Sequence, residues 1–123
     1  MGIDVYIKWD HQSEEEREAQ YTGFSNVHGH VGYLREAYHG GPYATQVLVP
    51  EGFVDYYEPT SIPSSTLLQR LPETLLTCKE RFRVVYNKEL NDDDPVLKSY
   101  TDFVHLYAKL EANGKNPKIL VSA

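Results

Sequence analysis

Cysteine is nearly absent from this sequence, which contains one thiol, Cys78, among 123 residues. One cysteine excludes an internal disulfide framework, a thiolate zinc cluster and a C-x-x-C redox pair. A chain of this length needs no such cross-link, because folding buries about two-thirds of the surface that the unfolded chain exposes. We therefore expect residues 1–123 to form a single domain around one hydrophobic core.

Positive charge is scarce as well. The sequence has 12 lysine and arginine residues against 18 aspartate and glutamate residues, which gives a formal charge of −6. Nucleic-acid binding depends on clustered lysine and arginine side chains that contact phosphates, so we expect no nucleic-acid partner. An acidic surface instead suits a basic protein partner.

Long apolar runs are missing too. No stretch approaches the roughly 20 apolar residues that a membrane-spanning helix needs. The first residues contain no basic segment, and Asp4, Lys8 and Asp10 interrupt the apolar pattern, which argues against a signal peptide. We therefore expect a cytoplasmic protein with no membrane partner. The sequence also lacks the nucleophile elbow of serine hydrolases and the phosphate-binding fingerprints of nucleotide enzymes.

The patterns that are present predict alternating strands and helices. Residues 3–9 alternate between apolar and polar side chains, which predicts a strand with one buried face. Ser13 and Glu16 have the spacing of a capping box and predict a helix that reaches about Gln20, with Gly23 after its end. Apolar residues at helical spacing predict a short helix over 31–39, with Gly40 as its stop. A continuous apolar run predicts a second strand over 44–49.

The second half is predicted to be mostly helical after a loop over residues 50–63. A helical stretch over 66–71 is expected to break or kink at Pro72, and a stronger helix is expected over 72–90. Asp94 and Pro95 have the character of an N-cap and a first helical residue. The helix they begin carries an apolar stripe formed by Val96, Tyr100, Phe103, Tyr107 and Leu110. A final strand over 117–121 is continuously apolar and is expected to be central and buried on both faces.

These elements predict an α+β fold with a small, about three-stranded mixed sheet and helices packed on it. The C-terminal helices are expected to be long and amphipathic. Because helices separate the last two strands, a parallel pairing of those strands through a right-handed crossover is permitted. The first strand could pair with either of them.

One segment, residues 23–43, concentrates the side chains of a candidate site. It holds three of the five histidines, five of the eight glycines and three of the ten tyrosines. Tyrosine combines apolar area with a hydroxyl group, which suits interfaces and ligand sites. The candidate ligand-binding residues are His28, His30, Tyr33, Arg35, Glu36, His39 and Tyr43.

Two kinds of ligand are compatible with this segment. On an extended strand, His28 and His30 would project to the same side, and His39 could complete a site for a divalent transition metal. Without that metal we expect no cofactor. Alternatively, Arg35 and backbone N–H groups at a helix start could bind a small anionic ligand. The structural interpretation is that the histidines bond loop carbonyls or face solvent and that Arg35 pairs with a surface glutamate.

The two ends of the chain resemble those of short, uncharacterised bacterial proteins, some of which are carried on mobile gene cassettes. The resemblance covers the opening Met-Gly-Ile-Asp-Val-Tyr, the amphipathic helix over residues 100–107, Gly114 and residues 118–122. It implies a cytoplasmic α+β protein of unassigned activity. It assigns a role to no residue.

The absence of a complete catalytic set favours a non-catalytic binding or regulatory module, which we expect to be homo-oligomeric, most simply a homodimer. Its pocket or interface would lie around residues 28–43. The alternative is a small hydrolase or isomerase that uses a histidine of the His28, His30 and His39 cluster as general base, with or without a metal. These hypotheses differ in geometry, because the enzyme requires the candidate side chains to converge.

Overall fold

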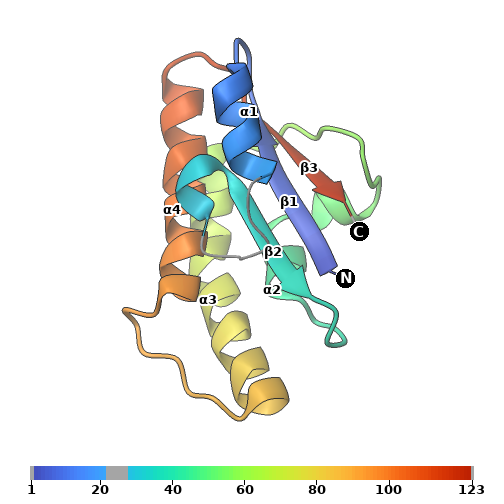
Figure 1. The fold of residues 1–123 in the computed structure, drawn as a ribbon, viewed down its shortest axis with the longest axis vertical. Helices are drawn as coiled ribbons and strands as arrows, with labels where there is room; N and C mark the ends of the chain where they lie inside the picture. Colours follow the sequence, from blue (N-terminus) through green and yellow to red (C-terminus); the bar gives the residue numbers. More distant parts are fainter. Residues whose placement is uncertain (1, 22–27, 123) are drawn as a thin grey trace.

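The computed structural model describes residues 2–21 and 28–122, and its centre is a three-stranded antiparallel sheet (Figure 1). β1 (Gly2–Lys8) lies in the middle, between β2 (Tyr33–Ala37) and β3 (Lys118–Ser122). Both pairings are antiparallel. The α+β class and a sheet of about three strands are therefore confirmed, whereas the sheet is antiparallel instead of mixed.

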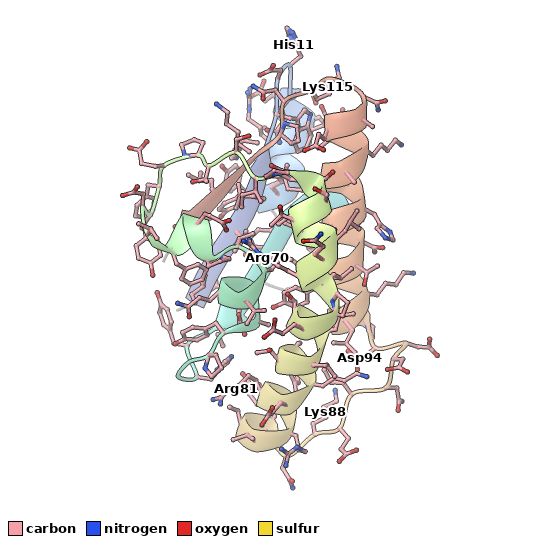
Figure 2. All side chains as sticks on the ribbon, turned by 180° about the vertical axis from the view of Figure 1, so that it is seen from behind. His11, Arg70, Arg81, Lys88, Asp94 and Lys115 are labelled. Carbon is pink, nitrogen blue, oxygen red and sulfur yellow. The ribbon has the colours of Figure 1, made fainter. Side chains whose placement is uncertain are left out.

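The helical segments cover the sheet on both sides. α2 and α3 lie over one face, as the view from behind shows, and α1 lies in front of the other face (Figures 1 and 2). A side chain of α1 confirms this placement, since the ring of Tyr21 lies 5.2 Å from that of Tyr6 on β1. The segments are α1 (Glu14–Tyr21), η1 (Gly29–Val31), α2 (Ala44–Leu48), η2 (Pro50–Phe53), α3 (Ser64–Tyr86) and α4 (Pro95–Ala112).

The hydrophobic core lies between the sheet and the helices behind it. Ile3, Val5 and Ile7 point into it from alternate positions of β1, which confirms the predicted buried face. The predicted stripe of α4 is also confirmed, because Tyr100, Phe103, Tyr107 and Leu110 are buried and Val96 packs against the core. Burial of such side chains stabilises the fold by about 25 cal/mol per Å² of apolar area.

The two predicted helix starts are confirmed in atomic detail. The backbone N–H of Glu16 donates to Oγ of Ser13 at 3.0 Å, and the N–H of Ser13 donates to Oε1 of Glu16 at 2.9 Å. The side chain of Asp94 accepts a hydrogen bond from the N–H of Val96 at 3.0 Å, with Pro95 as the first residue of α4. Gly23, which was expected to follow the first helix, lies outside the described residues.

The middle of the chain differs from the prediction. Residues 31–39 were expected to be helical, but they contain η1 and then strand β2. Residues 44–49 were expected to be a strand, but they contain helix α2. Val31, Leu34 and Tyr38 do not form a buried stripe, because Leu34 is buried in the core and Tyr38 is exposed.

Two further expectations are corrected. β3 is an edge strand with alternating burial, because β1 takes the central place between the other strands. Pro72 neither ends nor divides the long helix, since α3 runs unbroken from Ser64 to Tyr86. Both Pro72 and Leu68, four residues earlier, are exposed, so water can bond the carbonyl group that proline leaves without a donor.

Candidate functional site

The seven candidate residues do not form one cluster. Side chains of successive strand residues point to opposite faces, so Arg35 and Glu36 of β2 diverge. Glu36 faces the helices, next to His39 and Tyr43. Arg35 and Tyr33 face the opposite side of the sheet, and His28 and His30 lie at the start of β2, around η1.

Glu36 is a buried carboxylate that caps helix α2. Its oxygens accept hydrogen bonds from the backbone N–H groups of Ala44 and Thr45, both at 2.9 Å, and from the hydroxyl of Thr45 at 2.7 Å. These N–H groups belong to the first turn of α2, which has no capping side chain at Tyr43. Glu36 therefore has a structural role that its place in a strand did not indicate.

His39 completes this buried group. Its Nε2 atom lies 3.0 Å from Oε2 of Glu36, and its Nδ1 atom lies 2.8 Å from the carbonyl oxygen of Gly40. The centre of its ring lies 4.9 Å from that of Tyr43, with the two ring planes tilted by 43°. Arg81 reaches over from α3 (Figure 2) and donates to the carbonyl oxygen of His39 at 2.9 Å. Only 5% of the His39 side chain and 8% of the Glu36 side chain are exposed. The pair resembles a base with its orienting carboxylate, but a substrate has little access to it.

Tyr33 and Arg35 form a second group with β1 on the outer face of the sheet. Both donate to Oδ1 of Asp4, from the phenol at 2.7 Å and from the guanidinium at 2.9 Å. Burial and this hydrogen bond raise the pKa of Tyr33, and burial followed by the charge of Asp4 raises the pKa of Tyr6 to about 12. Both phenols therefore stay neutral at physiological pH. Tyr33 is buried, so this group links two strands and offers little surface to a ligand.

The metal site expected from His28, His30 and His39 is not formed. The chain at His28 turns into η1 and is not extended, so residues two apart point to different sides of a helical turn. The rings of His28 and His30 are 6.3 Å apart, and His39 lies past the far end of β2. Among residues 2–21 and 28–122, no group of three or more His, Cys, Asp or Glu side chains is placed to hold a metal ion.

The anion site expected at residues 29–32 also lacks its donors. The backbone N–H of Gly29 donates to Oγ of Ser99, and those of Val31 and Gly32 donate to carbonyl groups of the same turn. Arg35 pairs with Asp4, not with a surface glutamate. These donors are already used within the protein.

Among the candidate residues, His30 lines an open cavity of the described part of the chain. The cavity is a cleft of about 320 Å³ between α1, η1 and α4, and its apolar surface comes from Val31, Leu106 and Leu110. Trp9, just after β1, supplies an aromatic wall. This volume lies in the range typical of small-ligand sites.

The polar groups of the cleft are mainly acidic. Glu15 and Glu16 contribute carboxylates from the first turn of α1, and His30 contributes an imidazole from η1. Among the described residues that line the cleft there is no lysine or arginine. The arrangement combines an aromatic wall, an apolar floor and two negative charges.

Two contacts hold the walls of the cleft in place. Gln20, fully buried, donates to the carbonyl oxygens of Ile7 at 2.9 Å and Val31 at 3.0 Å, and so ties α1 to the sheet and to η1. Gly29 lets η1 lie directly on α4, because a Cβ atom there would be 1.7 Å from the carbonyl oxygen of Ser99. The position of His30 depends on both contacts.

The sequence pattern did not single out Trp9, Glu15, Glu16 or Gln20 as site residues. The acidic run that starts α1 was explained by helix capping, and Glu16 does bond Ser13. One signal was available, because Trp9 is the chain's sole tryptophan and lies five residues before that run. The apolar partners from α4 lie about 100 residues further on and come close only in the folded chain.

A second cavity, of about 540 Å³, lies between α3, α4 and the segment that joins them. Lys79, Lys98, Asp92 and Asp93 line it together with leucine side chains, and Lys79 already pairs with Asp92. Its charges of opposite sign compensate each other, so it selects no kind of ligand as clearly as the first cleft does.

Comparison of the chain with protein families, with curated proteins and with solved structures finds no match. Among the described residues, no helix combines the length and apolar character needed to cross a membrane.

Proposed function

We propose that this chain is a non-catalytic binding module and that its ligand site is the cleft between α1, η1 and α4. The observation that carries the proposal is the cleft itself, where Trp9 and the apolar floor meet His30 and two carboxylates. Concave, mostly apolar sites with a few convergent polar groups are the usual form of ligand sites. The proposed site thus retains one part of the candidate segment 28–43 and includes residues from three other parts of the chain.

The contacts that the other polar candidate residues make favour a binding function over a catalytic one. A general base must reach the proton that it removes. His39 and Glu36 are engaged with each other and with α2, and Arg35 and Tyr33 are engaged with Asp4. The histidine cluster on which a hydrolase or isomerase would depend is therefore divided, with some members at one end of β2 and the rest at the other end.

The sole tryptophan of the chain gives a direct test, because its emission reports on the cleft without background. A panel of neutral, anionic and cationic fragments is titrated while Trp9 fluorescence is followed. We expect at least one fragment to change the emission in a saturable way. The substitution Ala19→Leu fills the cleft and should abolish the change, whereas Ala112→Leu at the exposed end of α4 should leave it intact. No saturable change with any fragment would contradict the proposal.

We also propose that the module works as a homodimer in the cytoplasm. The support is exposed apolar area on the C-terminal half of α3, where Leu76, Val84 and Tyr86 are at least half exposed. Leu76 and Val84 lie about two turns apart on one side of α3, and large apolar side chains exposed on one side of a helix are typical of interaction surfaces. Size-exclusion chromatography with light scattering should show a dimer at micromolar concentration, and Leu76→Lys with Val84→Lys should convert it to a monomer. A monomeric wild-type protein would overturn this part of the proposal.

A further inference from the structure

We propose that the cleft between α1, η1 and α4 binds the ammonium group of a lysine side chain that a basic polypeptide presents. The inference rests on the proposed binding function and names the chemistry of the ligand. It follows from the identity of the groups that line the cleft, from their charge and from the charge of the surrounding surface.

The aromatic wall and the carboxylates select a cation. The face of an indole attracts an ammonium or guanidinium group within about 6 Å of the ring centre. Glu15 and Glu16 add two negative charges to the lining that holds Trp9, and no lysine or arginine lines this cleft within residues 2–21 and 28–122. An anionic ligand would instead meet these carboxylates without a positive partner.

The apolar lining of the cleft suits the aliphatic part of a lysine side chain. Val31, Leu106 and Leu110 offer apolar surface in the same cleft as the two carboxylates. Lysine buries its four methylene groups along such surfaces while its charged end stays close to water or to an acidic partner. One side chain therefore satisfies both halves of the cleft.

The surface around the cleft favours a polypeptide over a free amine. Glu14 and Glu18 are exposed on the same helix as Glu15 and Glu16, so that four glutamates against the single Arg17 give α1 a formal charge of −3, and the whole chain has a formal charge of −6. A field of this sign attracts a chain with several positive charges and speeds its association. A free amine would use only the groups inside the cleft.

The test titrates the protein with a blocked peptide of alternating glycine and lysine in low-salt buffer and follows Trp9 emission. The same peptide with acetylated lysine side chains keeps the stem and lacks the charge, and n-butylamine supplies the charge without a peptide. We expect saturable binding of the lysine peptide, at least about tenfold weaker binding of the acetylated peptide, and weakening of the lysine peptide with added salt.

A pair of matched substitutions distinguishes binding in the cleft from attraction by the overall negative charge of α1. Glu15→Gln removes a carboxylate that lines the cleft, and Glu18→Gln removes one charge from the same helix outside it. Glu15→Gln should weaken the lysine peptide about fivefold, and Glu18→Gln should weaken it less than about twofold. Equal effects of the two changes would show diffuse attraction and overturn the assignment to the cleft.

The remaining outcomes of the titrations also test the proposal. Binding of n-butylamine as tight as that of the peptide would overturn the polypeptide source and leave a small-amine site. If neutral or anionic fragments bind at Trp9 while the lysine peptide does not, the cation inference fails and the proposed binding function stands. If nothing changes Trp9 emission, both fail. The circular dichroism spectrum of each variant must match the wild type for its result to count.

Discussion

At the scale of single residues, Glu36 contributes most to the local structure of the region that was expected to bind a ligand. One carboxylate receives two backbone N–H groups and a hydroxyl, and it lies beside an imidazole. Buried hydrogen bonds to a charged group contribute about 1.5–3 kcal/mol each, and a buried donor that loses its partner costs about as much. Because Glu36 belongs to β2 and caps α2, it links the two elements.

The substitution Glu36→Gln is expected to lower the free energy of unfolding by about 2–4 kcal/mol, because an amide group would face donors that now meet a carboxylate. Glu73→Gln, which changes an exposed glutamate of α3 in the same way, is expected to have almost no effect. Urea denaturation followed by circular dichroism measures both changes. A stability of the Glu36 variant equal to that of the Glu73 variant would refute the capping role.

Local signals allowed some residues to be assigned correctly from the sequence. Ser13, Glu16, Asp94 and Pro95 were recognised because each cap and its partner lie within three residues of one another. Glu36 was expected to bind a ligand, because its partners lie eight and nine residues ahead and belong to a helix that was not predicted. A carboxylate that satisfies another element has the same sequence signature as one that binds a ligand.

At the scale of elements, the contact of η1 with α4 decides where the cleft lies. The N–H of Gly29 donates to Oγ of Ser99 at 2.9 Å, and Gly29 has no room for a side chain. η1 then continues through His30 and Val31 along the cleft. A glycine in the turn and a serine 70 residues away thus form one wall of the candidate site.

Gly29→Ala is expected to destabilise the protein by about 3 kcal/mol, because the new methyl group would overlap the carbonyl oxygen of Ser99 and η1 would have to move. The apparent Tm should fall, and the Trp9 emission maximum should shift because the cleft changes shape. Gly41→Ala is the control, since a Cβ atom there meets nothing within 4 Å. Two variants with the same Tm would contradict the close approach.

The errors in the middle of the chain have a physical cause at this scale. β2 places Leu34 and Glu36 on its buried face, so the apolar and polar alternation that marks a strand is missing. α2 has only five residues, and its N–H groups are capped from a distant strand, not by a neighbouring side chain. Tertiary contacts therefore determine both elements, and local periodicity predicted the opposite assignment.

At the scale of the whole molecule, the core contains groups that must remain protonated. Burial raises the pKa of the Cys78 thiol from 9.0 to about 12, and burial also raises the pKa values of Tyr100 and Tyr107. In the unfolded chain these groups ionise at their ordinary values. The unfolded state therefore binds fewer protons than the folded state at high pH.

The free energy of unfolding is thus expected to be nearly constant between about pH 6 and pH 8, to fall from about pH 9 and to fall more steeply above about pH 10. The sign follows because raised folded pKa values stabilise the fold only below the unfolded values. Cys78→Ala should reduce the fall between about pH 9 and 10, whatever its effect on stability at neutral pH. Tyr56→Phe, at an exposed position, should leave the profile unchanged. Denaturant unfolding at a series of pH values measures each slope, and identical slopes would contradict the role of Cys78.

The fold class was predictable because it depends on long amphipathic segments. The apolar stripe of α4 and the alternation of β1 identified the two largest contributors to the core. The order of the strands was not predictable, since a helix between two strands permits a parallel pair but does not require one. In the structure, β1 pairs with both of the other strands, and β3 lies at the edge of the sheet.

The way in which α1 is attached has a consequence for the whole molecule. Its one buried residue is Gln20, and it places no large apolar side chain in the core. Detaching α1 would break the hydrogen bonds of Gln20 and the contact of Tyr21 with Tyr6, but it would remove no side chain from the core, so we expect it to cost less free energy than unfolding of the whole chain. We therefore expect the helix that forms the acidic wall of the cleft to open as a separate unit of local unfolding. A partner that bridges α1 and α4 would hold this unit closed, so binding and the ordering of one helix would be linked equilibria.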